Sequence, residues 1–139
     1  MTDHGPSDGS GARPVWRQWQ LPATQQAPAL ARQLTREVLA VWQRADLEET
    51  AVLIVSELVT NAVRHASTGR PLVALRLETA GASVRIEVHD DDPRWPEPSA
   101  PDVLDESGFG FVLVSALAAK WGVNDTAAGK AVWAELADR

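Results

Sequence analysis

Two hydrophobic periodicities follow one another along this chain, and their order limits the folds that it can adopt. Over about 27–44, apolar residues recur every three or four positions, which predicts an amphipathic helix. A second helical pattern runs from Asp46, where Asp46 and Glu49 have the spacing of a capping box, to near residue 69. The pattern then changes to alternation over 72–79 and 84–88, which predicts two strands joined by a short turn.

The rest of the chain supplies further elements of both kinds. They are a strand over 15–21, a helix from after Gly108 to about Lys120, and a hairpin of 123–126 and 131–136 that turns at 128–130. Leu113, Leu117 and Trp121 are aligned along that third helix. Helices placed between strand pairs predict an α/β (α+β) two-layer sandwich, with a mixed, mainly antiparallel sheet and three helices on one face. We expect a single domain over 15–139, preceded by a flexible tail over 1–14.

The net charge of the chain is confined to one segment. The 139 residues carry a formal charge of −6, and the segment 90–106, DDDPRWPEPSAPDVLDE, holds seven acids and one base. The remaining residues are therefore neutral in sum. Four prolines make this segment an irregular loop, and its acidity argues against direct nucleic-acid binding. Trp95 within it is a candidate for partner contact or for packing against the domain edge.

Composition also bears on where the protein works. Cysteine is absent, which excludes disulfides and thiolate metal sites and suits a reducing cytosol, so we expect a cytoplasmic protein. No apolar run approaches the roughly 20 residues that cross a bilayer, and the N-terminus lacks a signal-peptide pattern. We expect no membrane association.

One segment of the second helix carries candidate chemistry. Glu57, Asn61 and His65 are spaced i, i+4, i+8 and share one helix face, with Arg64 beside it. An ordinary solvated polar face would have the same spacing. A carboxylate and an amide oxygen one turn apart would instead suit a Mg²⁺-bound phosphate with a base beside it.

Two further features lie after the predicted strand over 84–88. Gly108-Phe109-Gly110 precedes a helix start, where glycines and free N–H groups accommodate an anion, although a hinge would have the same sequence. Asp90 ends the strand and is either a turn residue or a ligand contact. The spacing of the aspartates that follow does not fit an EF-hand, because Arg94 takes the fifth position and no glycine is sixth.

These motifs, in this order and with Gly129 before the last strand, resemble the GHKL ATPase superfamily. Within it the chain is most similar to single-domain anti-sigma-factor serine/threonine kinases of bacterial partner switching, over about residues 15–137. The resemblance is carried most specifically by the segment ELVTNAVRHA, residues 57–66. It implies ATP and Mg²⁺ as cofactors, and a sigma factor and a STAS-type anti-sigma antagonist as partners. Whether the homodimer common in the family forms is left open by the sequence.

The resemblance also implies a role for each matched residue. Asn61 would ligate Mg²⁺, Glu57 would be the general base, and Asp90 would accept a hydrogen bond from the adenine amino group. The implied phosphate contacts come from Arg64, and from Gly108 and Gly110 through their N–H groups. His65 and Phe109 lie within these two motifs, and we count them with the nucleotide-binding residues.

The chain departs from the family pattern at three positions. Asp92 and Arg94 stand where the family has two glycines, and Ala131, beside Gly129 and Lys130, takes the place of a threonine that helps to bind adenine. Two functions therefore remain open. The first is a kinase that phosphorylates an antagonist protein, and the alternative is a non-catalytic protein-binding module with weak or no ATP affinity.

Overall fold

A computed structural model describes residues 14–65, 72–90, 113–126 and 129–137, and for His65 its backbone alone. Several predicted features lie outside these ranges: the tail over 1–13, the acidic segment from Asp91 onward with Trp95, and the motif Gly108-Phe109-Gly110. Among the described residues, no helix is both long enough and apolar enough to span a bilayer.

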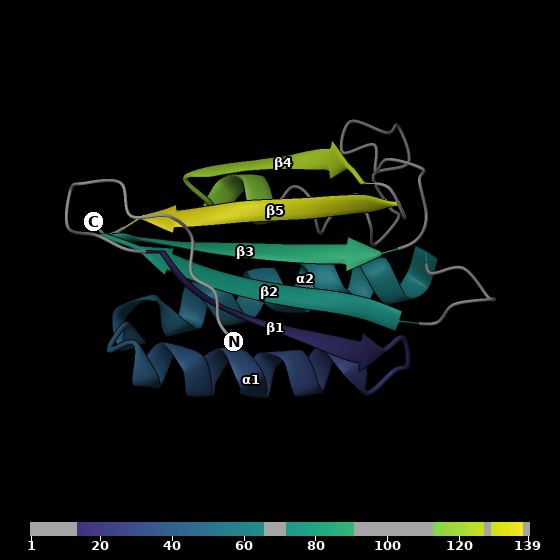
Figure 1. Ribbon diagram of the computed structural model, residues 1–139, viewed down its shortest axis with the longest axis horizontal. Coiled ribbons are helices and arrows are strands. Elements are labelled where there is room, and N and C mark those ends of the chain that lie inside the picture. The colour runs from purple at the N-terminus through teal and green to yellow at the C-terminus, as the bar shows by residue number, and fades with distance from the viewer. Residues whose placement is uncertain (1–13, 66–71, 91–112, 127–128, 138–139) are drawn as a thin grey trace.

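The centre of the molecule is a five-stranded antiparallel sheet with the strand order β1-β2-β3-β5-β4 (Figure 1). Its strands are β1 (Val15–Pro22), β2 (Leu72–Ala80), β3 (Ser83–Asp90), β4 (Lys120–Asp125) and β5 (Lys130–Ala137). All five predicted strands are therefore confirmed. β2 and β3 are joined through Gly81, whose φ of +62° is a backbone conformation that glycine adopts without a steric penalty.

The sequence placed one boundary wrongly near the third helix. Residues 113–117 are helical, but β4 already begins at Lys120, so Trp121 lies in a strand and not on the helix. Trp121 is in register with Ala134 of β5 and packs against the core. Pairing with a neighbouring strand, which the local period cannot report, decides this boundary.

The two long helices are α1 (Ala27–Val41) and α2 (Glu48–His65). α1 stops three residues earlier than predicted, and Gln43 follows with a φ of +60°. The predicted capping box is also wrong, because Asp46 lies in a short 3₁₀ turn (Ala45–Leu47). The Asp46 carboxylate accepts hydrogen bonds from Arg44 Nε and Nη2 at 3.0 and 3.1 Å, and the Arg44 guanidinium lowers the pKa of Asp46.

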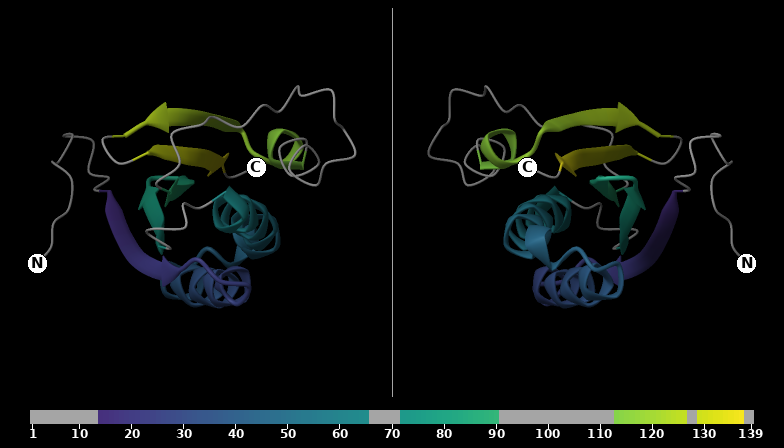
Figure 2. Two further views of the ribbon diagram at one scale, coloured as in Figure 1. Left: turned by 90° about the vertical axis from the view of Figure 1, so that its right-hand side faces the viewer. Right: turned by 90° about the vertical axis from the view of Figure 1, so that its left-hand side faces the viewer.

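α1, α2 and the helical residues 113–117 lie on the same face of the sheet (Figure 2). This confirms the predicted two-layer sandwich. The core fills the space between the layers, and its largest side chains with no exposed area include Leu39, Ile54, Leu75, Leu77 and Ile86. α2 is the central helix, because it packs against α1 and also against β2, β3 and β5.

The opposite face of the sheet carries charged and aromatic side chains. The Arg76 guanidinium lies 4.2 Å from the Trp16 ring centroid, and Arg85 lies at the same distance from Trp133. Arg85 also pairs with Glu87 at 2.7 Å and with Glu135 at 3.1 Å. Charged and aromatic partners therefore lie across neighbouring strands on this face, which we call the outer face.

Candidate functional site

The candidate site lies at the end of the sheet where the interior strand β3 ends and its neighbour β5 begins. Asp90 is the last residue of β3, and it follows Val84, Ile86 and Val88 in alternating burial, so its side chain faces the helices. Its register partner on β5 is Lys130. The Lys130 ammonium nitrogen lies 3.0 Å from Asp90 Oδ1, and the two side chains are only 6% and 2% exposed. A buried ion pair therefore occupies this corner of the fold.

α2 directs its C-terminal half toward the same edge of the sheet. α2 ends at His65 on the side of the molecule where β2 begins and β3 ends (Figure 1). Ala74 near the start of β2 is in register with His89 of β3. Glu57 and Asn61, one helical turn apart on α2, are both half-buried, whereas Arg64 is exposed. Glu57 and Asn61 are therefore less exposed than fully solvated side chains would be, whereas the exposure of Arg64 fits an ordinary solvated face.

The predicted site residues thus fall into two groups. The first group belongs to α2 and β3, which end on the same side of the molecule, and comprises Glu57, Asn61, Arg64 and Asp90. The side chain of His65, and all of Gly108, Phe109 and Gly110, lie outside what the structure describes. In the described part of the chain, no three His, Cys, Asp or Glu side chains are grouped to hold a metal ion. A cation here would therefore need ligands from elsewhere, such as phosphate oxygens, in addition to the Asn61 amide.

Lys130 is the residue that the sequence analysis missed. It was placed in a turn, but it is the first residue of β5 and is 5% exposed. The actual connection is closed by Gly129, whose N–H donates to Thr126 Oγ1 at 2.9 Å. A signal was present, because Lys130 continues the alternation of Val132, Ala134 and Leu136, the residues of β5 that face the core.

Ala131 lies on the other side of the sheet. It is in register with His89, and both alternate with the core-facing residues of their strands. The side chain beside Asp90 is therefore that of Lys130, and the expectation that Ala131 occupies a base-contacting position on this face is wrong. A strand places successive side chains on opposite faces, so one residue of difference changes the chemistry of the site.

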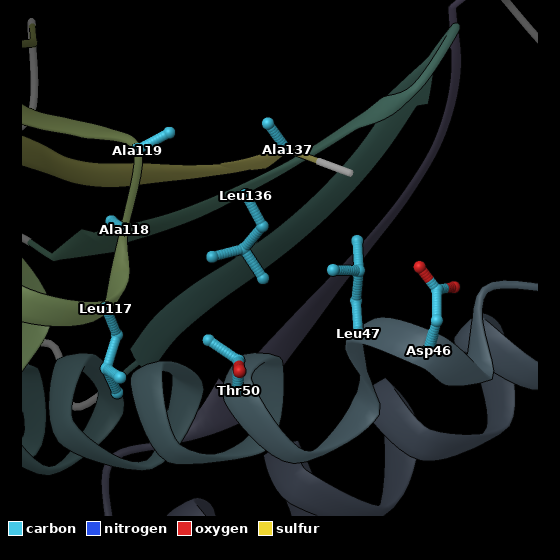
Figure 3. A pocket seen from close by; sticks show the side chains of 8 residues that line it. All are labelled: Asp46, Leu47, Thr50, Leu117, Ala118, Ala119, Leu136 and Ala137. Atoms are coloured by element: carbon cyan, nitrogen blue, oxygen red, sulfur yellow. The ribbon is translucent and has the colours of Figure 1, made fainter. Parts of the chain in front are cut away.

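A cavity of about 520 Å³ lies at the opposite end of β5 (Figure 3). Leu47 from the 3₁₀ turn, Thr50 from the start of α2, Leu117, and Leu136 from the end of β5 line it. Leu136 follows Lys130 by six positions along β5, about 20 Å in an extended chain. This cavity is therefore distinct from the Asp90 corner.

Comparison with known proteins places this architecture in a family. Residues 21–136 match the histidine kinase-like ATPase domain, so the chain belongs to that family. An uncharacterised protein of Streptomyces coelicolor is 34% identical over 84 residues, which cover 59% of this chain and 80% of that protein.

Two solved structures share the fold. The RsbU and RsbW domains of Rv1364c from Mycobacterium tuberculosis superpose with a TM-score of 0.66 at 22% identity, over 88% of this chain and 32% of that chain. The histidine kinase domain of a blue-light activated histidine kinase from Erythrobacter litoralis gives a TM-score of 0.51 at 22% identity, over 84% of this chain and 61% of that chain. This chain thus spans less than two thirds of either of these proteins.

Proposed function

We propose that this protein is an ATP-binding regulator of the anti-sigma-factor type and acts as a serine/threonine kinase on an anti-sigma antagonist. The observation that carries the proposal is the half-buried pair Glu57 and Asn61, one helical turn apart on α2, the helix that packs against β2, β3 and β5. Membership of the histidine kinase-like ATPase family supports nucleotide binding. The fold shared with a structure that contains an RsbW domain supports the regulatory role.

Each residue has a defined part in this proposal. The Asn61 amide oxygen suits one coordination position of Mg²⁺, which would neutralise phosphate charge during transfer. Glu57 would accept the proton of a serine hydroxyl as its oxygen bonds to the γ-phosphorus and the bond to ADP breaks. Asp90 would accept a hydrogen bond from the adenine amino group. Arg64, with the N–H groups of Gly108 and Gly110, would contact phosphate oxygens, and His65 and Phe109 would lie beside them.

The partners in this proposal are a sigma factor and a STAS-type antagonist protein, encountered in the cytoplasm. Catalysis would depend on positioning and charge neutralisation, because phosphoryl transfer requires little covalent chemistry from the protein.

The test separates binding from transfer through Glu57→Gln. This change removes the base but keeps the size and polarity of the side chain. We expect Mg²⁺-ATP affinity, measured by isothermal titration calorimetry, to stay within a few-fold. Transfer of the γ-phosphate to a purified STAS-type antagonist should fall by about 100-fold or more.

Glu49→Gln is the matched control, because it makes the same change at an exposed position two turns earlier on α2. It should alter neither affinity nor transfer. Unchanged transfer in Glu57→Gln would show that this residue is not the base.

The second candidate is a protein-binding module with weak or no nucleotide affinity. It is favoured by the buried Lys130 at Asp90 and by Asp92 and Arg94 in place of glycines. Calorimetry with ATP and Mg²⁺ distinguishes the two functions. Micromolar binding supports the regulator that uses ATP, and absence of heat at millimolar ATP supports the module.

A further inference from the structure

Lys130 and Asp90 are held opposite each other by the backbone on both sides. They form the last register pair of the β3–β5 ladder, which continues without interruption from Ser83 and Ala137 at the other end. Gly129 fixes the entry into β5 through its hydrogen bonds with Thr126. The 3.0 Å contact between the Lys130 ammonium and Asp90 Oδ1 is thus built into the sheet.

The Lys130 ammonium and an adenine amino group are both hydrogen-bond donors, so they compete for the Asp90 carboxylate. A carboxylate that accepts a hydrogen bond from an ammonium also gains the Coulomb attraction between two opposite charges, which a neutral amino donor does not supply. The adenine amino group is a neutral donor. It must therefore share Asp90 with a stronger donor that is already in place.

The Lys130 ammonium also cannot accept a hydrogen bond from the adenine amino group. Lysine carries three donors and no acceptor, whereas a threonine hydroxyl can both donate and accept. An adenine amino group that approaches Asp90 would bring a second set of donors next to Lys130. The burial of the pair adds to the cost, because moving the two groups apart would weaken the attraction between two buried charges.

We propose that Lys130 is an affinity-determining residue of the nucleotide site, because its ammonium takes the place on Asp90 that an adenine amino group would use. The wild-type chain therefore binds ATP more weakly than a chain in which a neutral hydroxyl stands at position 130. This inference rests on the proposed function, in which Asp90 accepts a hydrogen bond from the adenine amino group.

The test compares Lys130→Thr with the wild-type full-length chain in calorimetric titrations with Mg²⁺-ATP. Threonine keeps a donor for Asp90 and suits a strand, so the carboxylate retains a partner. We expect the variant to bind ATP at least about ten-fold more tightly. Lys120→Thr is the control, because Lys120 is the only other lysine of the chain and is exposed at the start of β4. It should match the wild type.

A second measurement avoids substitutions altogether and covers the case in which Lys130→Thr does not fold. With two lysines in the chain, ¹⁵N-labelled lysine gives two side-chain ammonium signals. At ATP concentrations that saturate the wild type in calorimetry, the Lys130 signal should shift while that of Lys120 stays in place. An unchanged Lys130 signal would overturn the inference.

The outcomes separate this inference from the proposed function. Equal or weaker ATP binding by a folded Lys130→Thr variant, with a wild type that binds, overturns the inference and leaves the proposed function intact. Binding by the variant alone supports the inference and shows the wild type to be a protein-binding module. Absence of binding in both chains overturns both.

Discussion

On the outer face of the sheet, the neighbours of Glu87 lower the pKa of its carboxyl group. His89 Nε2 lies 2.9 Å from one of its carboxylate oxygens, and Arg85 Nε donates to the other at 2.7 Å. The hydrogen bond with His89, and then that with Arg85, lowers the pKa of Glu87 from 4.5 to about 2, against the opposing effect of burial. Since the folded-state pKa is the lower one, ionised Glu87 stabilises the native chain.

We expect Glu87→Gln to lower the free energy of unfolding by about 1–3 kcal/mol at pH 7, because two charge-assisted bonds are weakened. The difference from the wild type should be fully present above pH 4.5 and should disappear as the pH falls through about 2. Urea unfolding at pH 7, 4 and 3 measures it. Glu37→Gln, at an exposed carboxylate on α1, serves as the control, and an equal pH dependence in both variants would contradict the assignment.

At the scale of single elements, the local sequence predicted which segments form helices and strands better than where they end. Alternation predicted β2 and β3 to within one or two residues, because each has one face in the core along its whole length. α1 and β4 were misplaced at their ends. The turn after Val41 and the pairing of Trp121 with Ala134 depend on contacts with other elements, which no window of sequence contains.

Two residues of α1 test how much the buried face of this helix contributes to the free energy of unfolding. Leu39 has no exposed area, whereas Val41, two residues later on the same helix, is 73% exposed. We expect Leu39→Ala to lower the free energy of unfolding by about 2–5 kcal/mol, through lost apolar burial and a residual cavity. Val41→Ala should change it by less than about 0.5 kcal/mol. Urea denaturation compares the two variants, and similar losses would show that α1 packs on the sheet through a different face.

At the scale of the whole molecule, the net charge of −6 belongs to the segment 90–106, of which the structure describes only Asp90. Asp90 itself is paired with Lys130, and the other six acids of the segment, with Arg94, account for five of the six net negative charges. We expect them to face a basic partner protein and not the nucleotide, because anionic side chains repel a triphosphate.

Replacing Asp91, Asp92, Asp102, Asp105 and Glu106 by their amides tests this expectation. ATP affinity should stay equal or rise, and any rise should shrink as salt is increased from 50 to 300 mM, on the order expected from screening. Calorimetry with Mg²⁺-ATP at both salt concentrations measures it. A loss of ATP affinity would show that the segment closes over the nucleotide.

The candidate site was predictable where it depends on one element. Glu57 and Asn61 are four residues apart on one helix, so their common face follows from the helical period alone. Asp90 could be placed at the end of a strand for the same reason. The side chain beside Asp90 could not, because Lys130 is 40 residues away and adjoins it only through the β3–β5 register.

What the local sequence determines and what only the tertiary structure decides therefore differ for a physical reason. Periodicity and spacing are local, and they determine the elements, the two-layer fold and the common face of Glu57 and Asn61 on α2. Strand register is non-local, since it is chosen by the packing of the whole sheet, and it alone decided that Lys130 and not Ala131 lies against Asp90. Because alternate residues face opposite sides of a strand, that one-residue distinction changes the group beside Asp90 from a methyl to a buried ammonium.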